Sequence, residues 1–288
     1  MARAFCLVLN TAPMPVAMGI ARIATRLLDR FQPRLRRAAL ANLAFAMPEL
    51  DATARGTLID GVFLSIARVL VYLSRFGRLA GNPANIGKII RYEGYEYFEQ
   101  ALKQGKGVLF YTAHLGNWEL SAFAHALLSR PMHVVVRPLD NPLIDGMVAR
   151  LRGLSGNFVI GKKEFARGIL KALAANEAVG ILADQNAGLN DGEFVQFFGK
   201  AACAQTGFAK IAAHSGAAVI PGFAIWSAAE GRYILRFYPP VAMTGDAHRD
   251  TQRLHEVLEA VIRAYPDQWL WIHRRWKTRP PGEAPLYD

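Results

Sequence analysis

The first 80 residues carry apolar positions at helical spacing. The pattern predicts three amphipathic helices, over residues 16–31, 34–47 and 52–76. Pro48 ends the second of them, because proline cannot continue a helix. We therefore expect a helical N-terminal region over residues 1–80.

From residue 107 the pattern changes to short apolar runs that alternate with amphipathic segments. The runs predict strands over residues 107–112, 132–136, 157–160 and 178–183. The segments between them predict helices over residues 117–129, 141–154 and 163–176. Runs that are apolar throughout are typical of strands covered on both faces. The alternation predicts an α/β fold with a mostly parallel sheet built from βαβ units.

The rest of the chain adds strands that make the predicted sheet mixed. Further strands are expected over residues 193–198, 217–226 and 232–238, and the last two read as a hairpin that turns around residues 229–231. Helices are expected near residues 204–215 and 250–264. Because there is no convincing linker, we expect the α/β domain, residues 81–288, to pack with the helical region as one structural unit.

A net charge of +11 favours anionic partners, namely nucleic acid, an acidic lipid surface or a phosphorylated substrate or carrier. No helix-turn-helix, zinc-finger or RNA-binding pattern appears, which argues against nucleic acid. The two cysteines, Cys6 and Cys203, lie far apart and support neither a disulfide framework nor a cysteine-rich zinc site. The seven histidines include no close pair, so we expect no metal.

Residues 4–21 form an uncharged stretch close to the minimum length of a membrane span, interrupted by Asn10, Pro13 and Pro15. The helix that follows carries arginines at four-residue spacing beside an apolar face. We interpret this region as a membrane-associating segment whose following domain stays on the cytoplasmic side. The alternative is a plain packing helix.

His114 and Glu119 lie in the stretch YTAHLGNWEL, between a predicted strand and a predicted helix. If the strand ends at Thr112 and the helix begins near Asn117, His114 lies in the turn and the Glu119 carboxylate can fold back toward it. Glu119 can then accept the Nδ1 proton, while Nε2 acts as a general base. No nucleophile motif accompanies the pair, so we expect the base to activate a hydroxyl of the substrate.

Two more predicted strands end in polar residues at the same edge of the sheet, where ligands bind in open parallel sheets. These residues are Arg137, Asp184 and Gln185. Arg137 is suited to a phosphate or a developing oxyanion, and Asp184 is either a second orienting group or a turn residue. With Asn117, they are our candidate substrate-binding residues.

Six blocks in the chain resemble the lipid A biosynthesis acyltransferase family, which adds secondary acyl chains to the lipopolysaccharide anchor. They are TAHLGNWE, with the H-x4-E spacing, and segments within residues 37–50, 134–145, 180–188, 197–223 and 267–281. The resemblance implies a glycerolipid-acyltransferase-like fold with His114 as base, Glu119 as its partner and Arg137 as an anion-handling residue. It also implies a membrane-associated enzyme on the cytoplasmic face of the bacterial inner membrane.

By the same resemblance, the acyl donor is a thioester carried on acyl carrier protein, and no other cofactor is needed. The acceptor is an anionic glycolipid, a lipid A precursor. Two alternatives remain open, which are the same chemistry on another glycolipid or glycerophospholipid, and a non-catalytic lipid-binding protein. The tryptophan-rich segment 268–277 suits either a lipid headgroup interface or burial against the sheet.

Overall fold

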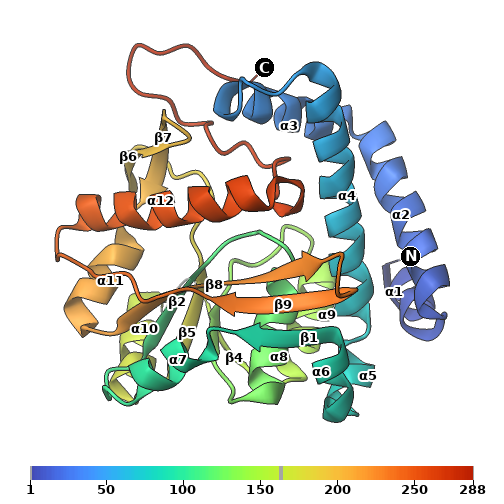
Figure 1. Ribbon diagram of the computed structural model, residues 1–288, viewed down its shortest axis with the longest axis horizontal. Helices are drawn as coiled ribbons and strands as arrows, with labels where there is room; N and C mark the ends of the chain where they lie inside the picture. The colour runs from blue at the N-terminus through green and yellow to red at the C-terminus, as the bar shows by residue number, and fades with distance from the viewer. Residues whose placement is uncertain (1, 162–164, 288) are drawn as a thin grey trace.

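A computed structural model describes residues 2–161 and 165–287 (Figure 1). Its centre is a seven-stranded mixed sheet in the order β1-β9-β8-β2-β5-β3-β4, in which only the β8–β9 pairing is antiparallel. The strands are β1 (Ile90–Glu93), β2 (Val108–Thr112), β3 (His133–Val135), β4 (Phe158–Ile160), β5 (Ala178–Leu182), β8 (Ala218–Ser227) and β9 (Arg232–Phe237). The α/β prediction is confirmed.

Helices cover both faces of the sheet because its central strands are apolar on both sides. Along β2, Val108 and Phe110 belong to one hydrophobic cluster, and Leu109 and Tyr111 belong to another on the opposite face. The first face is covered by α5 (Phe76–Ala80), α7 (Tyr95–Leu102) and α8 (Trp118–Leu128). The second is covered by α10 (Phe165–Ala174), α11 (Gly207–Ser215) and α12 (Ala247–Ala264).

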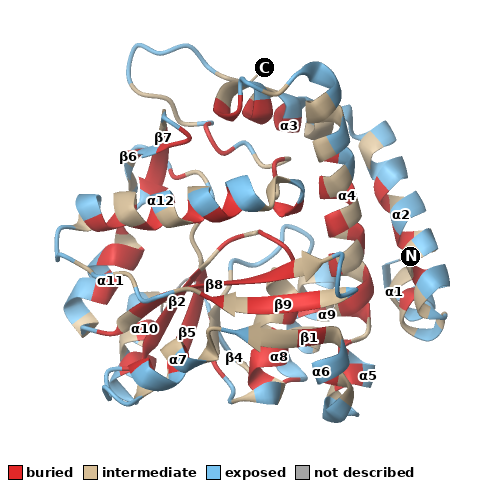
Figure 2. Ribbon diagram, viewed as in Figure 1, coloured by how far each residue is buried: buried red, intermediate tan, exposed pale blue. Residues whose placement is uncertain are grey.

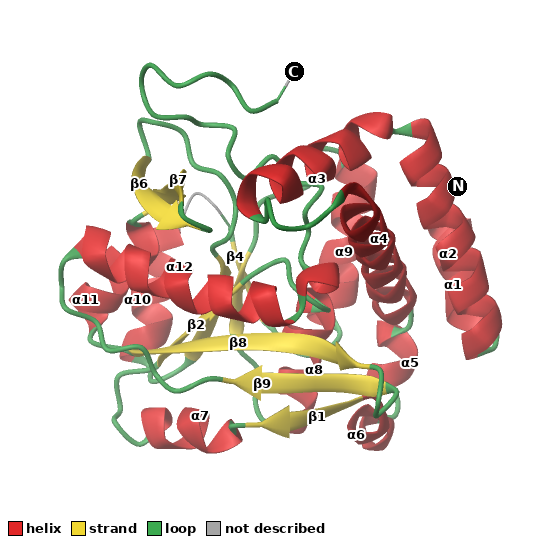
Figure 3. Cartoon of the chain, turned by 45° about the horizontal axis from the view of Figure 1, so that its top comes forward, coloured by secondary structure: helices red, strands yellow, loops and turns green. Residues whose placement is uncertain are grey.

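Shorter elements complete the chain. They are η1 (Pro83–Asn85), α6 (Ile86–Ile89), α9 (Pro142–Gly153) and η3 (Pro266–Gln268). A separate antiparallel hairpin, β6 (Gly192–Phe197) and β7 (Lys200–Gln205), stands apart from the large sheet, beyond α12 (Figure 3). The sequence predicted β6 but not β7, and it placed the start of α11 in residues that belong to β7. The predicted helix 163–176 corresponds to α10, and its positions 163 and 164 lie outside the described residues.

The N-terminal region contains α1 (Ala2–Thr11), α2 (Met14–Phe31), α3 (Pro33–Ala46) and α4 (Ala52–Ser74), and α5 lies at its end. Ile59, Val62 and Phe63 of α4 share a hydrophobic cluster with Leu109 and Tyr111 of the sheet. Within the described residues, α4 is the one helix long and apolar enough to cross a bilayer, and 44% of its apolar window is buried inside the protein. Helices in the core of a protein can have this same character, and α4 packs against α2, α8 and η3.

Residues 4–21 do not form one continuous helix. Helix α1 ends at Thr11, α2 begins at Met14, and both pack along α4 (Figure 1). Arg75 donates hydrogen bonds to the carbonyl oxygens of Leu9 and Ala12, which lie at the end of α1.

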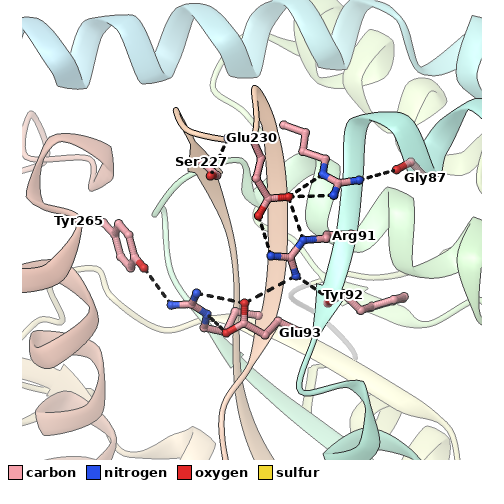
Figure 4. Close-up of polar contacts among 9 residues, drawn as sticks. Gly87, Arg91, Tyr92, Glu93, Ser227, Glu230 and Tyr265 are labelled. Carbon is pink, nitrogen blue, oxygen red and sulfur yellow. Dashed lines mark hydrogen bonds and ion pairs between the residues drawn. The ribbon is translucent and has the colours of Figure 1, made fainter.

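The outer edge of the sheet is held by charged side chains between β1 and β9 (Figure 4). Arg91 donates to both carboxylate oxygens of Glu230, at 3.0 and 2.7 Å, and Glu230 also pairs with Arg232 at 2.8 Å. Arg236 pairs with Glu93 at 2.9 Å. An edge strand rich in charged residues resists pairing with other chains.

The segment 268–277 is irregular, and its tryptophans are buried. Trp269, Trp271 and Trp276 are each at most 2% exposed, and Arg275 is fully buried among them. The burial alternative for this segment is therefore correct, and these tryptophans are not at a surface where they could meet lipid headgroups. Figure 2 shows the contrast between the buried strands and the largely exposed outer side of α2.

Candidate active site

His114 lies two residues beyond the end of β2, in the turn that leads into α8. Its Nδ1 is 2.8 Å from Oδ1 of Asp184, which lies two residues beyond the end of the neighbouring strand β5. The two parallel strands therefore bring together residues 70 positions apart in sequence. The His114 side chain is 18% exposed and that of Asp184 is 4% exposed, so the imidazole reaches solvent and the carboxylate does not.

Asp184 accepts three hydrogen bonds. Besides Nδ1 of His114, its donors are the backbone N–H of His114 and Nε1 of Trp269, both at 2.9 Å to Oδ2. Burial alone would raise the pKa of this carboxyl group, but the charge of His114 and these hydrogen bonds lower it well below its usual range. Asp184 is therefore ionised, and with Nδ1 protonated the Nε2 atom of His114 is free to accept a proton.

The pKa of His114 reflects two opposing effects. Burial lowers it, while the charge of Asp184 and the hydrogen bond to that carboxylate raise it, and the net shift is upward from the usual value of 6.5. The more distant charge of Glu119 adds to the upward shift and that of Arg152 opposes it. A base with a raised pKa accepts a proton more readily near neutral pH.

The turn that carries His114 is fixed by the segment around Trp269. Leu270 donates its backbone N–H to the carbonyl of His114 at 3.0 Å, and Gly116 donates to the carbonyl of Gln268 at 2.9 Å. Gly116 has φ +63°, and a Cβ atom there would lie 2.0 Å from the carbonyl oxygen of Ala224. Only glycine fits at this position, because the backbone of the turn lies directly against β8 there.

Glu119 lies in the first turn of α8, as expected, but its carboxylate does not contact Nδ1 of His114. It forms a two-pronged ion pair with Arg152 of α9, at 2.9 Å to Nε and 2.5 Å to Nη2. The Nδ1 position is taken by Asp184, because the end of β5 lies beside the turn and Glu119 points toward α9. The partner of His114 in the structure is therefore the residue that we had left as a second orienting group or a turn residue.

The other candidate residues differ in their surroundings. Asn117 is fully buried, and its Oδ1 caps α8 by accepting the backbone N–H of Leu120 at 3.0 Å. Arg137 follows β3, with its side chain 81% exposed and 3.7 Å from Asp140. Gln185 is exposed beside Asp184. Their roles in substrate binding stay predictions, and the surroundings of Asn117 favour a structural role.

Two residues of the site were missed from the sequence. Trp269 was considered only for a headgroup interface or for burial, and its hydrogen bond to Asp184 depends on a contact across 85 positions. Arg152 is one of two arginines near the end of α9, and the spacing alone does not mark the one that faces Glu119. Among the described residues, no group of three His, Cys, Asp or Glu side chains could hold a metal ion.

A cavity opens beside the site, between α8 and the sheet. Thr112, Trp118, Glu119, Arg152 and Leu182 line it at the carboxyl end of the strands. The Trp118 ring lies 5.1 Å from the imidazole of His114, so this ring connects the cavity with His114. Apolar side chains of α8, β2, β3, β5 and β9 form most of the remaining wall. The cavity is thus polar where it meets the site and apolar within.

The fold and this site define a class of α/β proteins in which a carboxylate-oriented histidine at the carboxyl edge of a parallel sheet stands beside an apolar cavity. This combination suits the transfer of an acyl chain to a hydroxyl group. Residues 1–278 match the family described as bacterial lipid A biosynthesis acyltransferase. The chain belongs to this family and is an O-acyltransferase.

Several relatives extend over most of this chain. The palmitoleoyltransferase of lipid A biosynthesis from Escherichia coli is 31% identical over 281 residues, which cover 96% of this chain and 89% of the relative. The lauroyltransferase of lipid A biosynthesis from the same organism is 29% identical, and the match covers 96% of this chain and 90% of the relative. A lipid A biosynthesis acyltransferase from Haemophilus influenzae is 28% identical, and the match covers 87% of this chain and 78% of the relative.

Proposed function

We propose that this protein transfers a fatty acyl chain from an acyl carrier protein thioester to a hydroxyl of a lipid A precursor, with His114 as general base. The observation that carries the proposal is the His114–Asp184 pair beside the apolar cavity. The acceptor is inferred from the relatives, which are lipid A biosynthesis acyltransferases.

The reaction runs in one displacement with no covalent enzyme intermediate. Nε2 of His114 removes the proton of the acceptor hydroxyl as its oxygen attacks the thioester carbonyl carbon. The carbon–sulfur bond breaks, and the proton on Nε2 passes to the departing thiolate. Asp184 stabilises the imidazolium that forms between these two transfers. General base assistance of this kind typically contributes about 10²–10⁴ in rate.

The ion pair of Glu119 and Arg152 supports a second role near the reacting atoms. Arg152 lines the cavity where it meets the site, and its side chain is 20% exposed. A cation placed there is suited to the oxyanion that develops on the thioester carbonyl. In this proposal Glu119 holds Arg152 in position, and it raises the pKa of His114 through its charge.

The positive charge of the chain supports anionic partners. Arg34 and Arg37 are exposed, and they line a small hollow together with Arg274 and Tyr287. Acyl carrier protein is acidic and the acceptor glycolipid carries phosphates, so both would be drawn to such a surface. The rival acceptors, another glycolipid or a glycerophospholipid, share this charge and would be bound by the same arginines.

The outer face of α2 supports attachment to the cytoplasmic face of the inner membrane. Ile23, Leu27 and Phe31 are 59%, 50% and 74% exposed and follow one another at four-residue spacing. The side that packs on α4 carries small residues instead, including Ala17 and Ala21, which are fully buried. Large apolar side chains outside and small ones inside are typical of a helix that lies in the lipid interface, and the arginines of α2 would meet acidic headgroups.

The test is to incubate the detergent-purified protein with acyl-loaded carrier protein and an under-acylated lipid A precursor, and to weigh the lipid product by mass spectrometry. We expect a gain of one acyl chain, and a fall of about 10²-fold or more with His114→Ala. Transfer to a phospholipid but not to the precursor would make the acceptor wrong and leave the chemistry intact. If wild type transfers to no acceptor, the non-catalytic lipid-binding alternative takes the place of this proposal.

A further inference from the structure

The apolar cavity has an identifiable inner end. Trp118 and His125 both line it from α8, and they are seven residues apart, so they lie on the same side of the helix two turns from each other. Two turns correspond to about 10 Å along the helix. An acyl chain that enters beside Trp118 therefore meets His125 after about 10 Å. A long fatty chain is longer than this distance, so only part of it fits between the two residues.

His125 is an unusual residue to find at the end of an apolar cavity. It is 2% exposed, its Nδ1 is 2.7 Å from the hydroxyl of Tyr92, and its Nε2 has no hydrogen-bond partner among the described residues. Burial lowers the pKa of His125 to about 3, so the ring is neutral. The rings of Phe98 and Phe110 pack against it at 4.7 and 5.4 Å.

The opposite wall includes Gly180, in the middle of β5. A Cβ atom at this position would lie 2.7 Å from Cε of Met132, so the absence of a side chain leaves the cavity its width there. Glycine inside a strand weakens it and often marks a place where a ligand approaches the backbone closely. Met132 and Gly180 both line the cavity and are buried.

We propose that His125, together with the contact between Gly180 and Met132, ends the acyl-chain site and sets the length of chain that the enzyme transfers. This inference rests on the proposed acyl transfer. A chain that ends at His125 leaves the ring in place. A longer chain would have to displace a ring held by Tyr92 and by the surrounding aromatic side chains, and its added methylenes would gain no apolar burial.

The test offers the purified enzyme a mixture of decanoyl, lauroyl, myristoyl and palmitoyl carrier protein thioesters and measures the distribution of chains in the lipid product. His125→Ala opens the inner end, and Gly180→Val fills it. Burial of one further methylene is worth about a fourfold preference. We therefore expect His125→Ala to raise the ratio of the chain two carbons longer than the wild-type optimum by about 15-fold, and Gly180→Val to lower the average length.

His125→Phe is the matched control, since it removes the same hydrogen bond to Tyr92 but keeps the bulk of the ring. We expect its chain distribution to match that of wild type. If His125→Ala proves unfolded by circular dichroism, Gly180→Val carries the test alone. An unchanged distribution in the folded variants, or an equal loss for every chain length, would overturn the inference. Failure of wild type to transfer any chain would instead overturn the proposed function.

Discussion

Replacing Asp184 by asparagine tests the assignment of the base and its partner most directly. Asp184 is buried and holds Nδ1 of His114 at 2.8 Å, so the substitution removes a charged hydrogen bond without changing the size of the side chain. Such a bond is worth about 1.5–3 kcal/mol, which corresponds to a fall of about 10- to 150-fold in kcat. The loss is larger if the asparagine amide donates to Nδ1 and leaves the proton on Nε2.

The pH dependence of the rate gives a second and more specific readout. Because His114 must be unprotonated to act as a base, the rate falls on the acidic side as pH drops through its pKa. In wild type this midpoint lies above 6.5, since Asp184 outweighs the effect of burial. Without the charge of Asp184, burial dominates and the pKa of His114 falls. We therefore expect the acidic limb of kcat/KM to move to lower pH in Asp184→Asn, measured by single-turnover acyl transfer across a pH series.

Glu119→Gln is the matched control for Asp184→Asn. It also neutralises one carboxylate near His114, but it contacts Arg152 and not the imidazole. We expect a smaller shift of the acidic limb in Glu119→Gln. The reasoning would be refuted if Glu119→Gln moved the limb and lowered kcat as much as Asp184→Asn or more, since the glutamate would then be the working partner of His114 during turnover.

Three further predictions concern the turn, the buried indole and the outer face of α2. Gly116→Ala should lower the free energy of unfolding by about 2–4 kcal/mol, measured by urea denaturation in detergent, because its Cβ would clash with the carbonyl of Ala224; a wild-type midpoint would contradict the geometry. Trp269→Phe should lower the free energy of unfolding by about 1–3 kcal/mol and should also lower kcat, because Asp184 loses a donor at 2.9 Å. An unaffected kcat would show that the indole does not position the carboxylate. Leu27→Ser should weaken binding to anionic vesicles by about 10-fold in co-sedimentation, with unchanged circular dichroism because the side chain is 50% exposed; equal binding would exclude α2 from the contact.

The architecture was predictable because the strands of the sheet are apolar on both faces and the helices between them are amphipathic. The pairing of β8 with β9 followed from two apolar runs around one short turn. The segment of residues 81–106 carried no comparable signal, so β1, α6 and α7 were missed. Strand β1 has four residues, of which Arg91 and Glu93 are charged, and its pairing depends on partners about 140 positions away.

The sequence predicted which residues lie at the carboxyl edge of the sheet, but not which of their side chains contact one another. His114, Arg137 and Asp184 follow three strands of that edge, and the sequence placed all three there. Which carboxylate would meet the imidazole depended on the direction of the Glu119 side chain, and this is decided by Arg152 on α9. Local spacing contains no information on such a contact, because the two residues are 33 positions apart.

The connection between the His114 turn and the segment around Trp269 has a consequence for how the site assembles during folding. The backbone partners of this turn, Gln268 and Leu270, and the indole of Trp269 lie far from it in sequence, and Asn42 donates to the carbonyls of Trp271 and His273. The imidazole therefore acquires its fixed geometry only when contacts between distant parts of the chain have formed, and such contacts are slow to form. A variant in which the segment 268–273 is loosened can keep both His114 and Asp184 and still lack the support that aligns them.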